Sequence, residues 1–355
     1  MTSASRMRIL VTGGAGFIGS ALVLKLVLEK NCEVVTVDAM TYAANPASLA
    51  VLHGHPGHRL IEADICDAPR MRAIMSDFAP AAVMHLAAES HVDRSITGPA
   101  AFVRTNVMGT QSMIDAARAH FGTLSGAERD DFRFLHVSTD EVFGSLGPTG
   151  LFDEETRYDP RSPYSASKAG SDHLVRAAGE TFGLPILISN CSNNYGPRQF
   201  PEKLIPLMIL NALEGKPLPV YGDGLNVRDW IHVEDHADAL IAIVEKGRVG
   251  ETYCVGARSE RTNMQVVRAL CAAMDRLRPD AAPHDRLITF VTDRPGHDRR
   301  YAIDSGKVER ETGWRPSRSF EEALEDTVRW YLANERWWRP IRQGLYRGER
   351  LGLAG

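Results

Sequence analysis

MRILVTGGAGFIG, residues 7–19, joins a short apolar run to a cluster of glycines, and this stretch decides the fold. The apolar run predicts a buried β-strand, and the periodic apolar residues behind the glycines predict a helix. Gly13, Gly16 and Gly19 allow a tight turn and let the backbone approach a pyrophosphate at the N-terminus of that helix. A strand, a glycine turn and a helix in this order predict a dinucleotide-binding unit.

Apolar runs and helical patterns alternate along the first half of the chain. Further strands are predicted at 32–38, 58–65, 81–88, 132–138 and 185–191, and helices at 68–78, 99–120 and 165–182. This alternation favours right-handed crossovers, and hence an α/β fold with a doubly wound parallel sheet of the Rossmann type.

The regular alternation weakens near residue 195, where the chain becomes rich in proline and glycine. We therefore expect a dinucleotide-binding Rossmann domain over 1–195 and, mainly over 196–355, a smaller C-terminal α/β substrate-binding lobe. Segments near 228–260 and 300–315 are expected to return to the first domain.

Composition excludes several classes of protein. The chain has 355 residues, a formal net charge of −4 and a pI near 6.3, which argues against an electrostatic binder of nucleic acid. No apolar stretch reaches the ~20 residues that span a bilayer, and the polar N-terminus does not resemble a signal peptide. Five scattered cysteines predict neither disulfides nor a zinc site. We expect a soluble cytoplasmic protein that binds no membrane.

Two further features are assigned structural roles. His85, His91 and His232 have no ligand partner at helical or turn spacing, so no metal site is predicted. The pattern at 320–336 predicts an amphipathic helix. The Arg and Trp residues after it could stack on nucleic acid, but a solvated tail is favoured because acidic residues lie close by.

Asp38 predicts which dinucleotide binds. It stands nineteen residues beyond Gly19 at a strand end, where a carboxylate can accept hydrogen bonds from both ribose hydroxyls. The same charge would repel a 2′-phosphate, so NAD is favoured over NADP. The alternative is a glycine turn followed by a surface aspartate, and Asp64 could equally cap a helix. The other residues expected along the cofactor are Phe17, Ile18, Ala39, Met40, Thr41, Asp64, Ile65, Leu86, Ala87 and Ala88.

Tyr164 and Lys168 stand four residues apart and therefore share one face of the helix predicted at 165–182. A phenol with a pKa near ~10 is a poor base at neutral pH. A nearby ammonium and a positive nicotinamide ring would lower that pKa, which gives a base for removing an alcohol proton. The pair alone is more often structural, but downstream of a dinucleotide-binding unit the catalytic interpretation is favoured.

Thr139, Asp140 and Glu141 close the strand predicted at 132–138. Ligands of open α/β sheets bind at the carboxyl ends of the strands, so this segment should face the site. Thr139 can hydrogen-bond a substrate hydroxyl. Simple dehydrogenation needs no carboxylate pair, whereas elimination needs a base at one carbon and an acid at the next. The alternative is an ordinary acidic surface turn.

At this point the sequence resembles the dTDP-glucose 4,6-dehydratases, a group within the extended short-chain dehydrogenase/reductase family. The segments that carry the resemblance are TGGAGFIG (12–19), HLAAESHVDRSI (85–96), STDEVFG (138–144), YSASKA (164–169), NNYGPRQFPEKLIP (193–206), YGDGLNVRDWIHVEDH (221–236) and DRPGHDRRYAID (293–304). Sugar-nucleotide epimerases lack the Asp-Glu pair, and GDP-mannose dehydratases carry Ser-Glu there. Phe143 departs mildly from the commoner tyrosine.

The resemblance implies NAD-dependent conversion of dTDP-glucose to dTDP-4-keto-6-deoxyglucose and water, a step of deoxysugar biosynthesis such as that of dTDP-L-rhamnose. In the implied cycle Tyr164 takes the C4 hydroxyl proton, Glu141 removes the C5 proton, and Asp140 protonates the departing C6 hydroxyl. Tyr164 and Lys168 would also contact the cofactor.

The resemblance also implies further contacts and a homodimer through the helices near 99–120 and 165–182. Thr105 and Asn194 match cofactor contacts. The matches to substrate contacts are Ser90, Thr139, Asn193, Lys203, Leu204, Pro219, Val220, Tyr221, Arg228, Asn263, Arg294 and His297. Two alternatives stay open: a dehydratase of another nucleotide sugar such as UDP-glucose, and a non-catalytic NAD-binding regulatory protein.

Overall fold

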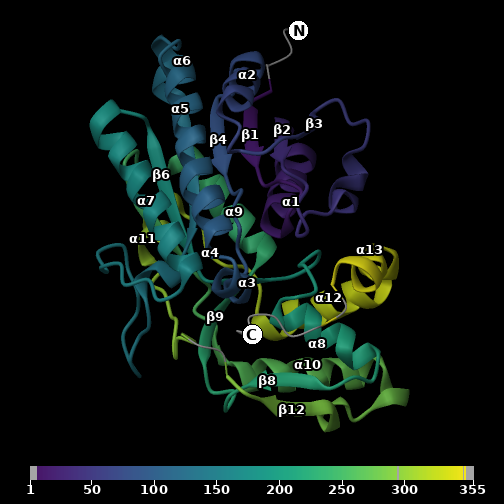
Figure 1. Ribbon diagram of the computed structural model, residues 1–355. Coiled ribbons are helices and arrows are strands. Elements are labelled where there is room, and N and C mark those ends of the chain that lie inside the picture. Colours follow the sequence, from purple (N-terminus) through teal and green to yellow (C-terminus); the bar gives the residue numbers. More distant parts are fainter. Residues whose placement is uncertain (1–5, 294–295, 347, 349–355) are drawn as a thin grey trace.

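A seven-stranded parallel sheet forms the centre of the computed structural model, which describes residues 6–293, 296–346 and 348 (Figure 1). Its strands, in spatial order, are β3 (His58–Glu62), β2 (Glu33–Asp38), β1 (Arg8–Thr12), β4 (Ala82–His85), β5 (Arg133–Thr139), β6 (Ile186–Cys191) and β10 (Thr252–Val255). The chain winds outward in one direction from β1 to β3 and in the other from β4 onward. This confirms the doubly wound, Rossmann-type α/β fold.

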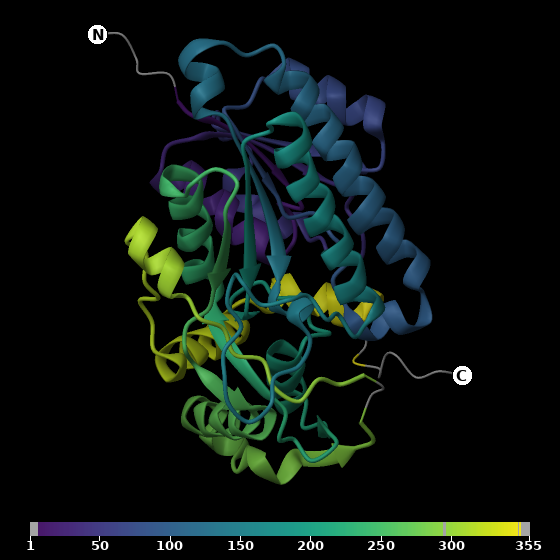
Figure 2. The same ribbon diagram turned by 90° about the vertical axis from the view of Figure 1, so that its left-hand side faces the viewer.

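Helices cover both faces of this sheet (Figure 2). One face carries α1 (Phe17–Leu24), α9 (Val233–Lys246) and α11 (Gly306–Thr312), and the other carries α2 (Ala68–Phe78), α5 (Thr110–Phe121) and α7 (Pro163–Phe182). Successive residues of β1 show why two layers form: Ile9 and Val11 enter one apolar cluster, and Leu10 enters the other. Strands buried on both faces need apolar residues at consecutive positions.

A smaller lobe follows the sixth strand. It contains a three-stranded sheet of β7 (Asn193–Tyr195), β9 (Val227–His232) and β11 (Glu260–Thr262), and a parallel pair of β8 (Leu218–Tyr221) and β12 (Ile288–Val291). Its core lies between α8 (Leu204–Leu213), α10 (Asn263–Leu277) and α12 (Phe320–Ala333). Between β9 and β11 the chain returns to the large sheet through α9 and β10. The domain boundary at residue 195 stays a prediction. The return of the chain through α9 and β10 agrees with the expected return near 228–260.

The prediction of a solvated tail after the helix at 320–336 is wrong. In the sequence, α12 is followed by α13 (Glu335–Pro340), whose Trp337 and Trp338 are each only 8% exposed. The Trp338 indole donates a hydrogen bond to the Tyr331 carbonyl at 2.8 Å, and the Trp337 indole donates one to Ser48 Oγ at 3.1 Å. Ser48 lies in η2 (Pro46–Leu52), so this hydrogen bond links α13 to the large domain.

The helix predicted over 99–120 is divided into three parts. They are α4 (Pro99–Phe102), the wider π-helical segment η3 (Val103–Gly109) and α5. At Gly109 an added Cβ would lie 2.5 Å from Ile65 Cδ1, so a glycine lets this segment pass close to the loop after β3. Sequence periodicity does not reveal that contact.

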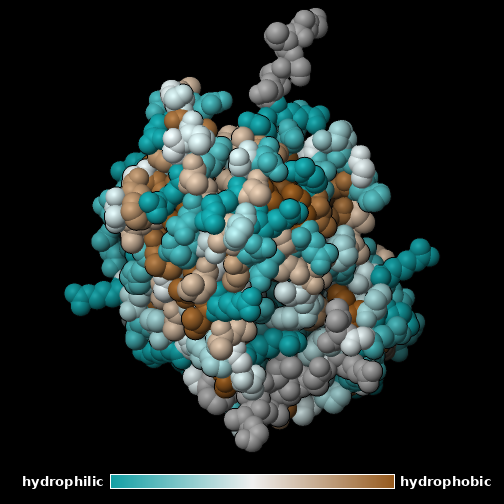
Figure 3. All heavy atoms as spheres, turned by 45° about the horizontal axis from the view of Figure 1, so that its top comes forward, coloured by the Kyte–Doolittle hydropathy of each residue, from teal (hydrophilic) through white to brown (hydrophobic). Residues whose placement is uncertain are grey.

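The outer surface is mixed. Figure 3 shows hydrophilic residues over much of the visible face, interrupted by smaller hydrophobic groups. Across the described ranges, no helix combines the length and the apolar character of a membrane span.

Candidate active site

The glycine turn lies where the winding of the large sheet reverses, between β1 and β4. Gly13 has φ +71°, and an added Cβ there would lie 2.8 Å from the Ala87 backbone. At Gly19 an added Cβ would lie 2.1 Å from the Gly13 carbonyl oxygen. No side chain caps the N-terminus of α1 at Gly16. The turn therefore offers free backbone N–H groups and a close approach, which fits the pyrophosphate of a dinucleotide.

Asp38 is held in a fixed orientation at the end of β2. Its Oδ2 accepts a hydrogen bond from the Ala15 N–H at 2.9 Å, and its Oδ1 accepts one from the Met40 N–H at 3.0 Å. Burial raises the pKa of Asp38, while these two hydrogen bonds oppose the rise. Each carboxylate oxygen can accept a further hydrogen bond, so the side chain fits a ribose diol.

One continuous pocket contains most of the predicted residues. Those lining it are Gly13, Gly16, Phe17, Ile18, Gly19, Asp38, Ala39, Thr41, Asp64, Ile65, Leu86, Ala87, Ala88, Ser90, Thr105, Thr139, Asp140, Glu141, Tyr164, Lys168, Asn193, Asn194 and Lys203. The predicted cofactor strip and the predicted catalytic groups thus share a single cavity at the carboxyl ends of the strands, as expected for an open sheet.

The remaining predicted residues lie outside this pocket wall. They are Met40, which contributes its N–H to Asp38, and Leu204, Pro219, Val220, Tyr221, Arg228, Asn263 and His297 of the smaller lobe. Arg294 lies outside the described residues. Arg228 donates to the carbonyls of Val227 and Asp298 and lies 4.1 Å from the Tyr301 ring centroid. Its positive charge lowers the pKa of Asp140, so it lies close to the catalytic end of the pocket.

Thr139, Asp140 and Glu141 form the transition from β5 into the short turn η4 (Asp140–Phe143). Thr139 Oγ1 accepts the Glu141 N–H at 3.3 Å and donates to Asp140 Oδ1 at 3.4 Å. Asp140 is 1% exposed. Burial raises its pKa well above the ordinary value, and the charges of Glu141 and Asp229 add to the effect. Asp140 is therefore suited to hold a proton at neutral pH.

Tyr164 and Lys168 project from the first turns of α7, which is fixed by a capping box between Ser162 and Ser165. Lys168 Nζ donates to the Val137 carbonyl at 2.9 Å. The lowered pKa predicted for Tyr164 is not what the protein alone provides. Burial raises the pKa of Tyr164 well above 10.0, Glu141 adds to the rise, and a hydrogen bond with Thr139 opposes it. The prediction concerns the enzyme with NAD bound, whose positive nicotinamide ring is part of the argument, and it stays a prediction.

Several buried polar atoms of the pocket lack a protein partner. Among the described residues they include Asp140 Oδ2, Ser192 Oγ, Asn193 Oδ1 and Gln199 Oε1. An unsatisfied buried polar atom costs about 1–3 kcal/mol, so a ligand rich in hydroxyl groups would stabilise this wall.

Some lining residues were missed. They are Val37, Ala43, Ala44, Ala63, Glu89, Val137, Ser138, Cys191, Ser192, Gln199, Phe200 and Glu202. Gln199 and Glu202 stand within the 193–206 segment, so that segment could have indicated them. Glu202 accepts a hydrogen bond from Arg94 Nε at 3.0 Å, and Arg94 lies over the Tyr42 ring at 4.0 Å. Small residues such as Ala43 carry no signal in the sequence.

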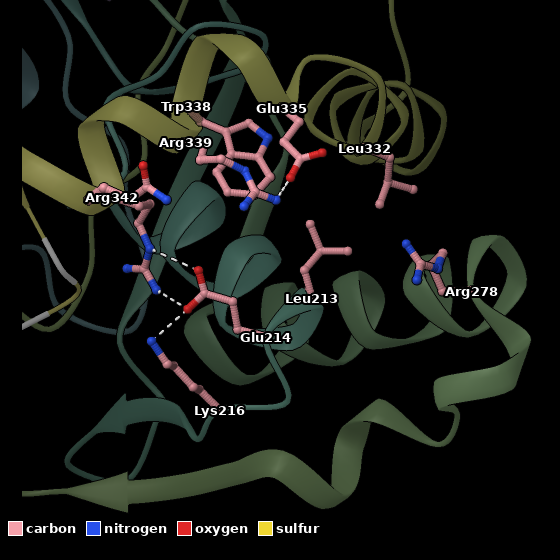
Figure 4. A pocket seen from close by; sticks show the side chains of 10 residues that line it. Leu213, Glu214, Lys216, Arg278, Leu332, Glu335, Trp338, Arg339 and Arg342 are labelled. Carbon is pink, nitrogen blue, oxygen red and sulfur yellow. Dashed lines mark hydrogen bonds and ion pairs between the residues drawn. The ribbon is translucent and has the colours of Figure 1, made fainter.

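A second cavity, of about 520 Å³, lies between α8 and α13 in the smaller lobe (Figure 4). Glu214 pairs there with Lys216 and Arg342, and Glu335 pairs with Arg339. None of the residues predicted for the site is among the described residues that line it. Only the Glu214–Arg342 pair joins two helical segments, the end of α8 and η7 (Ile341–Leu345); the other two pairs are local.

Comparisons with known proteins agree with this geometry. The family model described as GDP-mannose 4,6 dehydratase matches residues 10–327. A probable dTDP-glucose 4,6-dehydratase of Sinorhizobium fredii is 58% identical over 98% of this chain and 99% of its own. A dTDP-glucose 4,6-dehydratase of Xanthomonas campestris is 56% identical over 97% of this chain and 99% of its own.

Solved structures agree as well. The crystal structure of DesIV, a dTDP-glucose 4,6-dehydratase from Streptomyces venezuelae with NAD and TYD bound, has a TM-score of 0.87 and 44% identity, covering 94% of this chain and 100% of that one. Family-model match, full-length identity and shared architecture lead to one assignment. The chain belongs to the dTDP-glucose 4,6-dehydratases of the extended short-chain dehydrogenase/reductase family.

Proposed function

We propose that the chain is an NAD-dependent hydro-lyase that converts dTDP-glucose to dTDP-4-keto-6-deoxyglucose and water. The observation that carries this function is the pair of buried Asp140 and partly buried Glu141 at the end of β5, in the same pocket as Tyr164 and the glycine turn. An acid and a base on adjacent residues suit the loss of water from C5 and C6. They would have no task in simple alcohol oxidation.

The residues of the pocket fit NAD. The cradle at Gly13 and Gly19 would hold the pyrophosphate, Asp38 the adenosine ribose, and Lys168 the nicotinamide ribose. When bound, NAD would supply a hydride acceptor for C4 and, in its reduced form, a hydride donor for C6.

The protein's own groups perform the proton transfers. Tyr164, aided by Thr139, takes the O4 proton and leaves a C4 ketone. Glu141 then removes the C5 proton, which the ketone has acidified, and Asp140 gives its proton to O6 as water departs. The C5 proton is returned at the end. Tyr164 thus finishes protonated and Asp140 deprotonated, so one proton must pass between them through solvent before the next turnover.

Asn193, Lys203 and Ser90 support placement of the nucleotide sugar beside the acids. Lys203 Nζ donates to the Ser90 carbonyl at 3.0 Å and so links the smaller lobe to the loop after β4. The product class belongs to deoxysugar biosynthesis, such as the route to dTDP-L-rhamnose. All five cysteines are free thiols, which suits the cytoplasm where we expect the enzyme to act.

The same proposal includes a homodimer that forms through the helices near 99–120 and 165–182. Val103 and Met108 of η3 are 52% and 59% exposed, and Phe182 at the end of α7 is 51% exposed. Segment η3 and α5 pack beside α7, as Figures 1 and 2 show. Replacing Val103 and Met108 together by Glu should yield monomers in sedimentation experiments, whereas the same change at exposed Leu151 should not. A dimer that survives the double change would place the interface elsewhere.

The function is tested by assaying purified protein with dTDP-, UDP- and GDP-hexoses for the alkali-induced absorbance of a 4-keto product. We expect turnover with dTDP-glucose, and a loss of at least about 100-fold in Tyr164→Phe with substrate binding retained, because general base catalysis contributes about 10²–10⁴-fold. Absence of a 4-keto product from dTDP-glucose, or an unchanged kcat in Tyr164→Phe, would overturn the proposal.

A further inference from the structure

A buried polar cluster lies beneath Lys168, on the side away from the pocket. Asp172, one helical turn after Lys168 on α7, is 0% exposed, and so is His136 of β5. His136 Nε2 lies 3.1 Å from Asp172 Oδ1 and 3.4 Å from Lys168 Nζ. The reaction steps above use neither Asp172 nor His136.

The hydrogen bonds around Asp172 suit a negative charge. Its Oδ2 accepts from Ser138 Oγ and from the Tyr158 hydroxyl, each at 2.8 Å, while Arg176 donates to the same Tyr158 hydroxyl at 3.0 Å. Burial alone would raise the pKa of Asp172. The hydrogen bond from His136, with the ammonium of Lys168 and the Ser138 hydroxyl, outweighs it and holds the pKa below the ordinary value.

The contacts of His136 favour one tautomer. Its Nδ1 has no hydrogen-bond partner among the described groups, so a proton there would be buried and unpaired. A proton on Nε2 can instead be donated to the Asp172 carboxylate. Burial lowers the pKa of His136 to about 4, and Lys168 adds to the decrease, so the ring is neutral at pH 7. His85 of β4 packs against it, with ring centroids 5.3 Å apart.

Lys168 itself lacks a direct counter-ion. It is 4% exposed, and within the described part of the chain its ammonium forms no ion pair, only the bond to the Val137 carbonyl and the contact with His136. Burial lowers its pKa, and the negative charge of Asp172, with a smaller contribution from Cys191, opposes the decrease. A buried amine tends to lose its proton unless a negative group compensates it.

We propose that Asp172 is a positioning residue of the dehydratase: held in place by the Nε2–H of His136, its carboxylate is the buried counter-ion whose charge keeps Lys168 protonated and aimed at Tyr164. This inference rests on the proposed function, because Tyr164 is the base of the first step. Glu141, Asp140 and Cys191 surround Tyr164 on the pocket side, and their influence is unfavourable to a phenolate. The ammonium of Lys168 is then the protein's own source of stabilisation for it.

The test compares Asp172→Asn with Tyr158→Phe, which removes one neutral hydrogen bond but leaves the charge of Asp172. Two quantities are measured against pH: the phenolate absorbance of Tyr164 in NAD-saturated enzyme without sugar, taken as a difference from Tyr164→Phe, and kcat with dTDP-glucose. In Asp172→Asn we expect the midpoints of both pH titrations to move upward by about one pH unit or more. Below the new midpoint kcat should be about tenfold lower than in the parent enzyme, and above it kcat should be restored. Tyr158→Phe should leave both midpoints in place.

The sign of the shift separates the alternatives. If Asp172 acted on Tyr164 directly, removing its negative charge would move the midpoints downward, and that result would overturn the proposal. So would a uniform loss of kcat at every pH with unmoved midpoints, because it would mean a purely structural role. If Asp172→Asn does not fold, Asp172→Ser, which also removes the negative charge, should give the same upward shift, and unmoved midpoints there would also overturn it. If the parent protein were inactive on dTDP-glucose, the titration without sugar would still decide the role of Asp172.

Discussion

Two adjacent carboxyl groups can serve as acid and base only if their surroundings differ. Asp140 is enclosed, and burial together with Glu141 raises its pKa well above the ordinary value. Glu141 is only partly buried and borders the pocket. The protonated form of Asp140 is therefore present below its raised pKa and is lost as the pH rises through it. The two groups should titrate as a coupled pair.

Replacing each carboxyl group by its amide should separate the steps of the reaction. In Asp140→Asn we expect oxidation at C4 to survive while loss of water slows, because the amide keeps the shape but cannot donate the acid's proton. In Glu141→Gln we expect slow exchange of solvent deuterium into C5. Stopped-flow absorbance of the reduced cofactor and NMR of the sugar measure these steps, and both variants should accumulate reduced cofactor ahead of 6-deoxy product. A variant that forms product at the parent rate would disprove the role given to that residue.

Asp38 should set the choice of cofactor. In Asp38→Ala the carboxylate that is oriented by Ala15 and Met40 is gone, so the ribose loses its acceptors and a 2′-phosphate loses a repelling charge. We expect the Kd for NAD to rise by about 10-fold or more, as hydrogen bonds to a charged group contribute about 1.5–3 kcal/mol. The preference for NAD over NADP should fall, as measured by fluorescence titration with each dinucleotide. Unchanged affinity for NAD would refute the ribose contact.

At the scale of elements, the sequence predicts best where the period of apolar residues decides the structure. The strand predicted at 32–38 is found at Glu33–Asp38, and the helix predicted at 68–78 is found at Ala68–Phe78. The pocket at the ends of these strands could likewise be predicted, because parallel strands bring their carboxyl ends to one edge.

Prediction fails where distant contacts decide. The π-helical segment before α5 depends on the approach of Gly109 to Ile65, and α13 is buried because Trp337 meets Ser48, 289 positions away. The sequence likewise does not reveal the burial that raises the pKa of Tyr164 in the protein without cofactor. The smaller lobe, with its short strands and turns, gives the weakest periodic signal; Val220 lies in its core and Leu204 packs against that core.

The docking of α13 yields a prediction about stability. Trp337→Ala should lower the free energy of unfolding by about 3–5 kcal/mol, because a large buried ring is removed and a cavity is left. Ser48→Ala, which removes only the acceptor of the indole, should cost about 1 kcal/mol. Exposed Arg336→Ala is the matched control and should change little. Urea denaturation followed by fluorescence measures these values, and a stable Trp337→Ala would show that α13 is not anchored by this side chain.

At the scale of the whole molecule, buried neutral histidines should make the fold sensitive to acid. Burial lowers the pKa of His136 and His232 to about 4 and of His236 to about 3, and it lowers that of His85 well below 6.5. In the unfolded chain these rings have the ordinary histidine pKa of about 6.5. Below that pH the unfolded state therefore binds up to four more protons than the folded state. Their contribution to stability is present above that pH and is lost progressively below it.

Buried carboxyl groups with a raised pKa, Asp140 and Asp229 among them, oppose this trend. Burial raises the pKa of Asp229 to about 6, so its ionisation destabilises the fold as the pH rises from about 4 to 6. Between pH 6 and 5 the histidines therefore outweigh Asp229, since each proton taken up on unfolding contributes about 1.4 kcal/mol per pH unit. We expect the free energy of unfolding to fall by several kcal/mol from pH 7 to pH 5.

His236→Gln tests which groups are responsible. The His236 ring is fully buried, and its Nδ1 lies 2.9 Å from Asn194 Oδ1, a contact that a glutamine amide can replace. The variant should reduce the slope of unfolding free energy against pH by about one proton, or about 1.4 kcal/mol per pH unit, between pH 6 and 5. His53→Gln is the matched control, since His53 is exposed and water surrounds its ring in both states. Urea denaturation at half-unit pH intervals measures the slope. An unchanged slope in His236→Gln would mean that its ring is protonated in the folded protein as well as in the unfolded chain, and that His236 does not contribute to the acid sensitivity.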